Sequence, residues 1–285
     1  MKKNMRKIAK SVVYNIPYGT KLAFIPGRFR FANSYFIGRY AQIFKWLANS
    51  NERSNFSYSL MPKSESYIAH TLAVALHTSP DVIAGYMQEP KQNQELLHHV
   101  QAASANSTFR HEADERVEFG RRLGWYATVR VKKPRVVIET GVDKGLGAVL
   151  LCSALLKNSE EGQAGRYFGT DINPEAGYLL SGRYREFGEI LLGDSIKSLG
   201  NIVDPVDVFI NDSDHSSIYE YDEYLTIASK LSSGAIILGD NAYVSDSLQR
   251  FADETGRSFL FIREEPSGHW YPGAGIGIAF DTIKT

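Results

Sequence analysis

The chain has 285 residues, of which 43% are hydrophobic and 12% aromatic, and its 32 basic residues balance 32 acidic ones. These values are typical of a folded globular protein and exclude a disordered or collagen-like chain. Cys152 is the only cysteine, so an intramolecular disulfide and a metal cluster held by several thiolates are both excluded. The length suits one large domain or two modest ones.

The zero net charge hides a strong asymmetry along the chain. Residues 1–50 contain ten lysines and arginines and no acid, since the first acid is Glu52. The rest of the chain therefore carries 22 basic against 32 acidic groups. We expect residues 1–50 to form a basic, aromatic arm. It would pack on the acidic body or on a second copy, or contact an anionic membrane or a lipid-linked substrate.

The N-terminal sequence indicates a cytoplasmic protein, with any membrane contact being peripheral. No run of about 18 apolar residues is present, so no transmembrane helix is predicted. The apolar run 11–14 is too short for a secretory signal, and Pro17 and Gly19 prevent its extension. An organellar transit peptide is disfavoured because bulky aromatic residues are as frequent here as basic ones.

Helical patterns dominate the first 130 residues. Phe36, Tyr40, Phe44 and Leu47 recur at three- and four-residue spacing, which predicts an amphipathic helix over 34–48. Nothing in this part alternates as a strand does, so we expect an all-helical region. Further helices are predicted at 64–77, 80–88, 91–104 and 112–129.

The pattern changes at Pro134, after which short apolar runs alternate with helical stretches. This alternation predicts a parallel, doubly wound sheet with its ligand crevice at the carboxyl ends of the strands. Strands are predicted at 135–139, 167–171, 190–192, 206–210 and 235–238, and helices at 148–156, 174–186, 195–200 and 217–231.

The last two apolar runs, 259–263 and 276–280, are joined by a loop too short for a crossover helix, so they predict an antiparallel hairpin. The expected fold class is α/β, a seven-stranded, mostly parallel sheet that ends in this hairpin and is preceded by an all-helical N-terminal region. The predicted divisions are the arm 1–50, a helical region 51–130 that serves as a cap, an oligomerisation surface or a lid, and a cofactor-binding domain 131–285.

The first candidate site comes directly after the first predicted strand. Glu139, Thr140, Gly141 and Gly145 belong to a G-x-x-x-G-x-G turn that leads into a helix. Such glycines let the backbone approach a ligand closely, and the helix N-terminus offers free N–H groups, so a nucleotide-like ligand is indicated. The spacing differs from the G-x-G-x-x-G of dinucleotide folds, and Glu139 suits a cationic ligand better than a pyrophosphate. A turn that binds no ligand is the alternative.

Carboxylates also come after the second and third predicted strands. Asp171 could accept hydrogen bonds from both hydroxyls of a ribose, in NAD or in an adenosyl compound. Asp194, with Ser195 beside it, could accept from an adenine amino group. Alternatively, one of these two residues caps the next helix.

The fourth and fifth strands carry the most informative cluster. Asp212, Asp214 and His215 come after one strand, and Asp240 and Asn241 come after the next. Asp212, Asp240 and Asn241 would supply part of an octahedral Mg²⁺ site. Carboxylates this close repel one another unless a cation or protons intervene, so a metal accounts for the cluster. The alternative is that the two strand-end acids only cap the adjoining helices.

In this order and spacing, the motifs resemble the class I S-adenosylmethionine-dependent methyltransferases. More narrowly, they are similar to the metal-dependent O-methyltransferases, which include macrocin-type sugar, catechol and caffeoyl-coenzyme A enzymes. The resemblance covers about 120–281, and Ser213 departs from the usual D-G-D-H of that branch. It implies S-adenosylmethionine bound by Glu139, Thr140, Gly141, Gly145, Asp171, Asp194, Ser195 and Asp212, and Mg²⁺ or another divalent cation bound by Asp212, Asp240 and Asn241.

The resemblance implies methylation of a hydroxyl on a small molecule or a sugar-containing metabolite, in natural product or glycan biosynthesis. His215 or Asp214 would remove the proton, and we favour His215 because an aspartate beside a divalent cation is a poor base. We expect a homo-oligomer and no nucleic-acid partner. Two other classes stay open, an NAD-linked oxidoreductase and a non-catalytic nucleotide-binding or membrane-associated protein.

Overall fold

The computed structural model describes Tyr14 and residues 18–282. The chain divides into two compact units, one made by the chain up to Asn49 together with 268–270, and one made by 50–267 with the chain from Tyr271 onward. The second unit holds the whole β-sheet.

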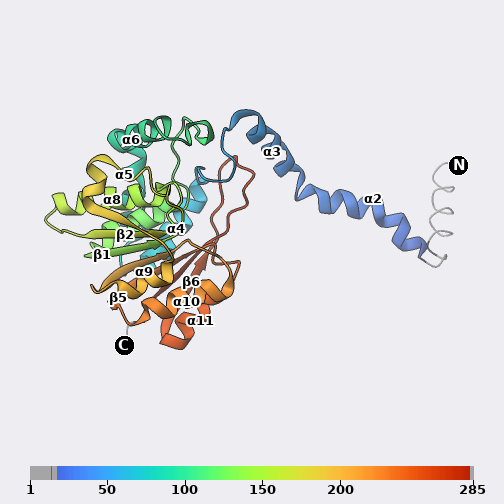
Figure 1. The fold of residues 1–285 in the computed structure, drawn as a ribbon. Helices are drawn as coiled ribbons and strands as arrows, with labels where there is room; N and C mark the ends of the chain where they lie inside the picture. Colours follow the sequence, from blue (N-terminus) through green and yellow to red (C-terminus); the bar gives the residue numbers. More distant parts are fainter. Residues whose placement is uncertain (1–13, 15–17, 283–285) are drawn as a thin grey trace. The chain divides into compact units, whose positions relative to one another are not determined.

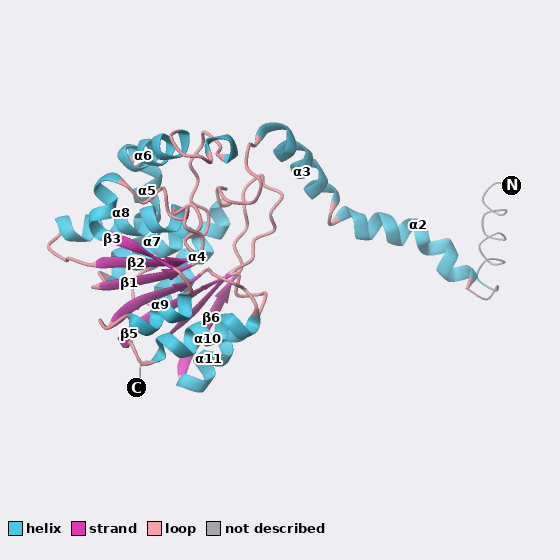
Figure 2. Cartoon of the chain, viewed as in Figure 1, coloured by secondary structure: helices cyan, strands magenta, loops and turns pink. Residues whose placement is uncertain are grey.

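Seven strands form one sheet in the order β3-β2-β1-β4-β5-β7-β6, shown in magenta in Figure 2. Strands β1 to β5 pair in parallel, whereas β7 runs antiparallel between β5 and β6. The predicted fold class and the antiparallel terminal pair are therefore confirmed. The strands are β1 (Val136–Thr140), β2 (Arg166–Asp171), β3 (Gly188–Leu192), β4 (Val206–Asn211), β5 (Leu231–Asp240), β6 (Arg257–Ile262) and β7 (Ile276–Asp281).

Helices cover both faces of the sheet (Figure 1). Alternate residues of one strand enter different cores, so Val137 packs with α4, α5, α7 and α8, whereas Ile138 packs with α9, α10 and α11. The helices are α4 (Pro62–Ala75), α5 (Pro80–Gln92), α6 (Gln94–Ala105), α7 (Arg122–Lys132), α8 (Leu146–Glu160), α9 (Ser195–Asn201), α10 (Ser217–Ala228) and α11 (Ser247–Thr255), with 3-10 turns η1 (Arg110–Glu112) and η2 (Gly182–Phe187).

The register aligns the carboxyl ends of the central strands. Thr140 at the end of β1 lies opposite Thr170 on β2 and Asn211 on β4, and Asn211 in turn lies opposite Gly239 on β5. The chain segments that leave these strands therefore emerge at one edge of the sheet, which is where ligands bind in folds of this class.

Two predicted helices are wrong. The helix expected over 112–129 begins only at Arg122, because the Asp114 carboxylate accepts from the Ser50 hydroxyl and the Asn51 N–H, which fixes the preceding segment as a loop. The helix expected over 174–186 is a turn and then η2. There, the Gly177 N–H donates to the carbonyl of Asp143 in the glycine loop instead of to a helical neighbour.

The described part of the arm contains helices α2 (Gly19–Ser34) and α3 (Ile37–Asn49). The sequence predicted α3 but missed α2, which includes Pro26. Trp46 of α3 packs against Trp270 with 5.4 Å between ring centroids, which groups 268–270 with the arm. The other predicted arm residues, 1–13 and 15–17, lie outside the described residues. In the part of the chain that the structure describes, no helix combines the length and hydropathy needed to cross a membrane.

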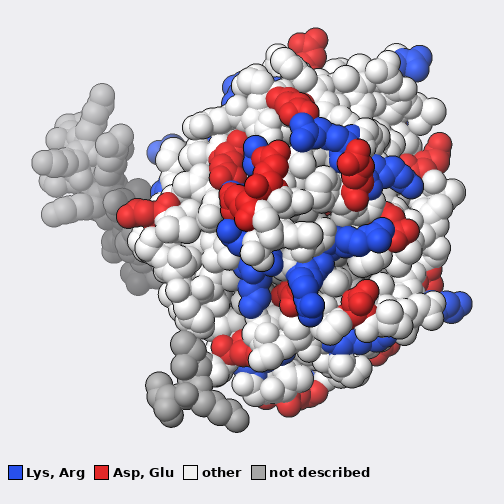
Figure 3. Space-filling view, turned by 90° about the vertical axis from the view of Figure 1, so that its left-hand side faces the viewer, with Lys and Arg blue, Asp and Glu red and all other residues white. Residues whose placement is uncertain are grey.

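Charged side chains of both signs share the surface. On the face drawn in Figure 3, lysines and arginines are interspersed with aspartates and glutamates. Elsewhere in the chain and independently of this view, exposed charges form ion pairs between elements, such as Arg183 with Glu95 at 2.6 Å and Lys133 with Glu161 at 2.8 Å. Such exposed pairs each contribute at most about 1 kcal/mol to stability.

Candidate functional site

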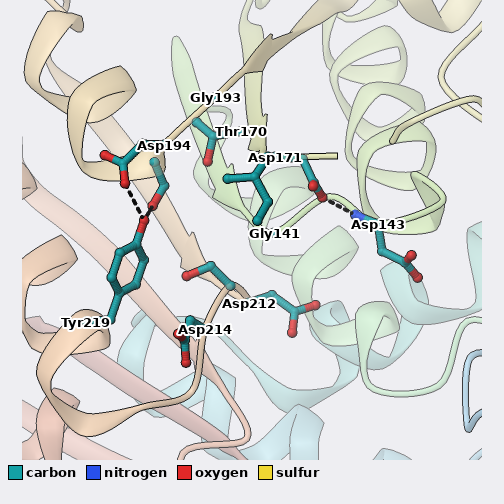
Figure 4. A pocket seen from close by; sticks show the side chains of 12 residues that line it. Gly141, Asp143, Thr170, Asp171, Gly193, Asp194, Asp212, Asp214 and Tyr219 are labelled. Carbon is teal, nitrogen blue, oxygen red and sulfur yellow. Dashed lines mark hydrogen bonds between the residues drawn. The ribbon is translucent and has the colours of Figure 1, made fainter. Parts of the chain in front are cut away.

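A pocket of about 450 Å³ opens where β1, β2, β3 and β4 end (Figure 4). Pockets of this size accommodate a small organic ligand or cofactor. The pocket brings together five residues that the sequence predicted for a cofactor, together with Asp214. Its lining is Gly141, Asp143, Thr170, Asp171, Ile172, Gly193, Asp194, Ser195, Asp212, Ser213, Asp214 and Tyr219.

The glycine loop fits tightly against the chain segment at the end of β4. Gly141 has a φ of 80°, and a Cβ at this position would overlap the carbonyl oxygen of Asp212. Only glycine satisfies both the positive φ and the close approach. Gly145, with a φ of 95°, lies against Gly177 and is not among the residues that line the pocket.

Asp171 is held rigidly at the pocket wall. One carboxylate oxygen accepts the Asp143 N–H and the other accepts the Asn173 N–H, both at 2.8 Å, and Figure 4 shows the first of these bonds. Each oxygen keeps further lone pairs, so the carboxylate can still accept from two neighbouring hydroxyls of a ligand.

Asp194 caps helix α9 and also lies in the pocket. One carboxylate oxygen accepts the Lys197 N–H at 2.9 Å, so the capping alternative is confirmed. The other oxygen accepts from the Tyr219 hydroxyl at 3.2 Å (Figure 4). The Ser195 hydroxyl is 2.8 Å from the same tyrosine oxygen. The cap therefore orients Asp194 without removing it from the pocket wall.

A second polar group lies beside this pocket, at the ends of β4 and β5. Asp240 is fully buried, and both of its carboxylate oxygens face the guanidinium of Arg121. Asp212 lies 3.8 Å from Nη2 of Arg121 and 4.0 Å from Nη2 of Arg122. Burial and the Asp240 carboxylate raise the pKa of Asp212. Burial would also raise the pKa of Asp240, but Arg121, a hydrogen bond with Asp212 and Arg122 together outweigh burial and lower it.

The predicted base and the second amide ligand adjoin this pair. Nε2 of His215 lies 3.8 Å from the Asp212 carboxylate and accepts from the Asn241 amide at 2.7 Å. The side-chain oxygen of Asn241 accepts from the Tyr271 hydroxyl at 3.3 Å. Asp214 is exposed, and its carboxylate accepts the Ser216 N–H at 2.8 Å. The fold therefore brings all the residues predicted for catalysis and metal binding to one edge of the sheet.

Comparison with known proteins agrees with this geometry. Residues 138–242, less than half of the chain, match the family model described as a methyltransferase domain. This part of the chain is similar to a methyltransferase domain. No curated protein sequence matches the chain.

Two solved structures resemble the fold around residues 138–242. One is the O-methyltransferase of Bacillus cereus in complex with SAH, with 15% identity, a TM-score of 0.50, and coverage of 70% of this chain and 97% of that one. The other is cofactor-bound Rv0187 from MTB, with 18% identity, a TM-score of 0.50, and coverage of 70% and 96%. At this level of sequence identity, the comparison shows similarity of the fold alone.

Glu223 is a buried residue within the matched segment that sequence analysis missed. Its carboxylate accepts from Thr140 at 3.2 Å and Ser213 at 2.7 Å, and also from Ser195 and Asn211. Burial raises the pKa of Glu223, and these hydrogen bonds oppose the shift. One signal was available in the sequence, since this residue lies at helical spacing from the apolar Ile227.

Glu139 lies in the layer next to the pocket and is not among its lining residues. It is 1% exposed and accepts from the Tyr167 hydroxyl at 2.5 Å, and a Cβ on Gly147 would overlap its carboxylate. Burial raises the pKa of Glu139 from 4.5 to about 7 in spite of the tyrosine hydrogen bond. Thr140 beside it is likewise buried and bonded to Glu223.

We expect this pKa shift to make stability depend on pH. Below about pH 4.5, Glu139 is protonated in both the folded and the unfolded states, so it contributes nothing. As the pH rises from 4.5 to about 7, the unfolded state ionises first, and the free energy of unfolding falls by roughly 3 kcal/mol. Glu139→Gln should lack this decrease in the free energy of unfolding.

Urea unfolding of both proteins between pH 4 and 8 measures the effect, since other titrating groups cancel in the difference. As the pH rises through this window, the free energy of unfolding of Glu139→Gln should increase relative to that of the wild type. A difference that does not change with pH would show that Glu139 has an ordinary pKa.

Proposed function

We propose that the protein transfers a methyl group from S-adenosylmethionine to a hydroxyl oxygen of a small molecule or sugar-containing metabolite. The observation that carries this proposal is the pocket at the carboxyl edge of the sheet. Its wall joins the glycine loop, the rigid Asp171 carboxylate and the strand-end Asp212 in one methyltransferase domain.

The pocket wall suggests how the cofactor binds. Asp171 would accept from both ribose hydroxyls, while Asp194 and Tyr219 would contact the adenine. The backbone at Gly141 would lie against the methionine part, between the ribose and the acidic residues. The sulfonium methyl would then point toward Asp212, where the acceptor enters. Methyl transfer requires in-line alignment of the acceptor oxygen, so positioning is the main task of these residues.

Proton removal from the acceptor falls to His215 in this proposal. Imidazole is the side chain that most often acts as a general base, a role worth typically about 10²- to 10⁴-fold in rate. The Asn241 amide orients the ring and occupies the lone pair of Nε2, so this hydrogen bond must be released before Nε2 can take the proton. Asp214 is the second candidate, because it is exposed and lines the same pocket.

The Mg²⁺ ion implied by the resemblance would rest on Asp212, Asp240 and Asn241. In the structure, ligand atoms of Asp212, His215 and Asp240 also lie within 4.8 Å of one another. The donor atoms suit Mg²⁺ in kind. The arrangement does not fit it, because Arg121 contacts both oxygens of Asp240. We therefore assign no step of the reaction to a metal.

The basic arm is the part of the chain that we propose contacts a partner. Exposed aromatic and aliphatic side chains lie on α2 and α3 next to basic residues and without any acid. This combination supports peripheral contact with an anionic membrane surface or a lipid-linked acceptor. Packing of the arm on the body and assembly into a homo-oligomer stay predictions.

Calorimetry with S-adenosylmethionine and with NAD tests the function. We expect one S-adenosylmethionine to bind per chain and NAD not to bind, because the pocket presents carboxylates where a pyrophosphate would lie. Binding of NAD alone would favour an oxidoreductase, and binding of neither would favour a non-catalytic protein. A methyl-transfer screen over sugar-bearing metabolites, lipid-linked glycans and catechols would then identify the acceptor.

A further inference from the structure

Arg121 is a buried cation at the position where the sequence predicted a metal ion. It precedes α7 and is 5% exposed. Its Nε and Nη2 atoms contact the two carboxylate oxygens of Asp240, and Nη1 donates to the Tyr58 hydroxyl at 2.8 Å. The Tyr58 hydroxyl lies in turn 3.4 Å from the Glu264 carboxylate. The guanidinium is therefore fixed by partners on more than one side.

The charges at this edge of the sheet already balance. Two carboxylates, Asp212 and Asp240, face two guanidinium groups, Arg121 and Arg122, at distances of up to 4.0 Å. Acidic side chains that gather without a cation would repel one another, which was the reason to expect a metal from the sequence. Because the two arginines neutralise the two carboxylates, the cluster does not require a metal ion.

A divalent ion would also compete for the same oxygens. Asp240 has no exposed surface, and Arg121 engages both of its oxygens. An ion bound to Asp240 would lie close to a guanidinium whose charge cannot be lost by deprotonation. The two cations would repel strongly in a buried site, so the metal could bind only if the arginine left.

We infer that Arg121 takes the place of the divalent cation in this protein. It holds Asp240 and Asp212 in position as a permanent positive charge, and methyl transfer proceeds without a bound metal. Arg121 is a positioning residue because it lies beneath the surface and cannot contact an acceptor directly.

The inference rests on the proposed function and widens the range of acceptors. An enzyme that chelates its substrate through a metal selects vicinal diols, such as catechols. A site whose cation is a buried guanidinium has no such requirement, so a single hydroxyl suffices. The acceptors therefore include sugars and other molecules that carry one isolated hydroxyl.

Titration with Mn²⁺, monitored by electron paramagnetic resonance, tests the inference and does not depend on methyl transfer. The wild-type protein should bind Mn²⁺ only weakly. Arg121→Ala, which frees Asp240, should bind it at least ten-fold more tightly, and a second change, Asp240→Asn, should abolish the gain. Arg116→Ala is the matched control, because it removes an exposed arginine from the same loop and should leave Mn²⁺ binding unchanged.

Mn²⁺ binding to the wild-type protein at micromolar concentration, lost in Asp240→Asn, would overturn the inference. If Arg121→Ala does not fold, two measurements on the wild-type protein decide. One is the Mn²⁺ titration, and the other is the S-adenosylmethionine affinity, which should be the same with and without EDTA. A failure of S-adenosylmethionine to bind would refute the proposed function and leave the Mn²⁺ result standing, so the two outcomes are distinguishable.

Discussion

Asp171→Ala should weaken the binding of S-adenosylmethionine by about 100-fold. The carboxylate would accept two charge-assisted hydrogen bonds from the ribose, each worth about 1.5 kcal/mol, and 1.4 kcal/mol corresponds to a ten-fold change in affinity. The two N–H groups that now hold Asp171 keep its oxygens directed into the pocket, so the loss cannot be replaced by a neighbouring acid. Isothermal titration calorimetry measures the change.

Asp204→Ala is the control for this variant. It removes an exposed carboxylate just before β4, at the amino end of the strand and therefore far from the pocket edge, so affinity should stay within about two-fold of the wild type. Thermal unfolding of both variants reports whether the loop at Asn173 is disturbed. Unchanged affinity in a folded Asp171→Ala protein would remove this residue from the cofactor site.

Glu223→Ala should lower the free energy of unfolding by about 3 to 5 kcal/mol, because it leaves buried donors without their acceptor. Thr140, Ser195, Asn211 and Ser213 come from three segments, the ends of β1 and β4 and the start of α9, and all four donate to this carboxylate. S-adenosylmethionine affinity should fall as well, since two of these residues line the pocket. Urea unfolding measures the first effect and calorimetry the second.

Asp222→Ala on the same helix is the matched control, because Asp222 is exposed. Its effect on stability should be within about 0.5 kcal/mol. Equal stability of the two variants would show that the Glu223 carboxylate is not the acceptor that holds these three segments together.

Much of this architecture could be predicted from the sequence because it depends on local patterns. The alternation of apolar runs with helical stretches predicted a parallel, doubly wound sheet, and the short loop before β7 predicted its antiparallel direction. The strand-end acids could be assigned to one site because parallel strands end at the same edge of a sheet.

The missed features depend on contacts between distant segments. Arg121 approaches Asp240 across 119 positions of sequence, and no spacing rule relates the two residues. The turn at Gly177 replaces a helix because it bonds to Asp143 in the glycine loop. Sequence patterns report the preferences of a segment, but they do not report which distant partner overrides them.

Asp212 connects the two halves of the site. Its backbone oxygen limits the space at Gly141 on the cofactor side, while its carboxylate faces Asp240 and His215 on the other side. A shift of this residue on acceptor binding would also displace the glycine loop. By thermodynamic linkage, an acceptor that tightens cofactor binding through Asp212 must itself be bound more tightly, by the same factor, once the cofactor is present. The order in which the two ligands bind would then depend on their concentrations, since the residue couples them in both directions.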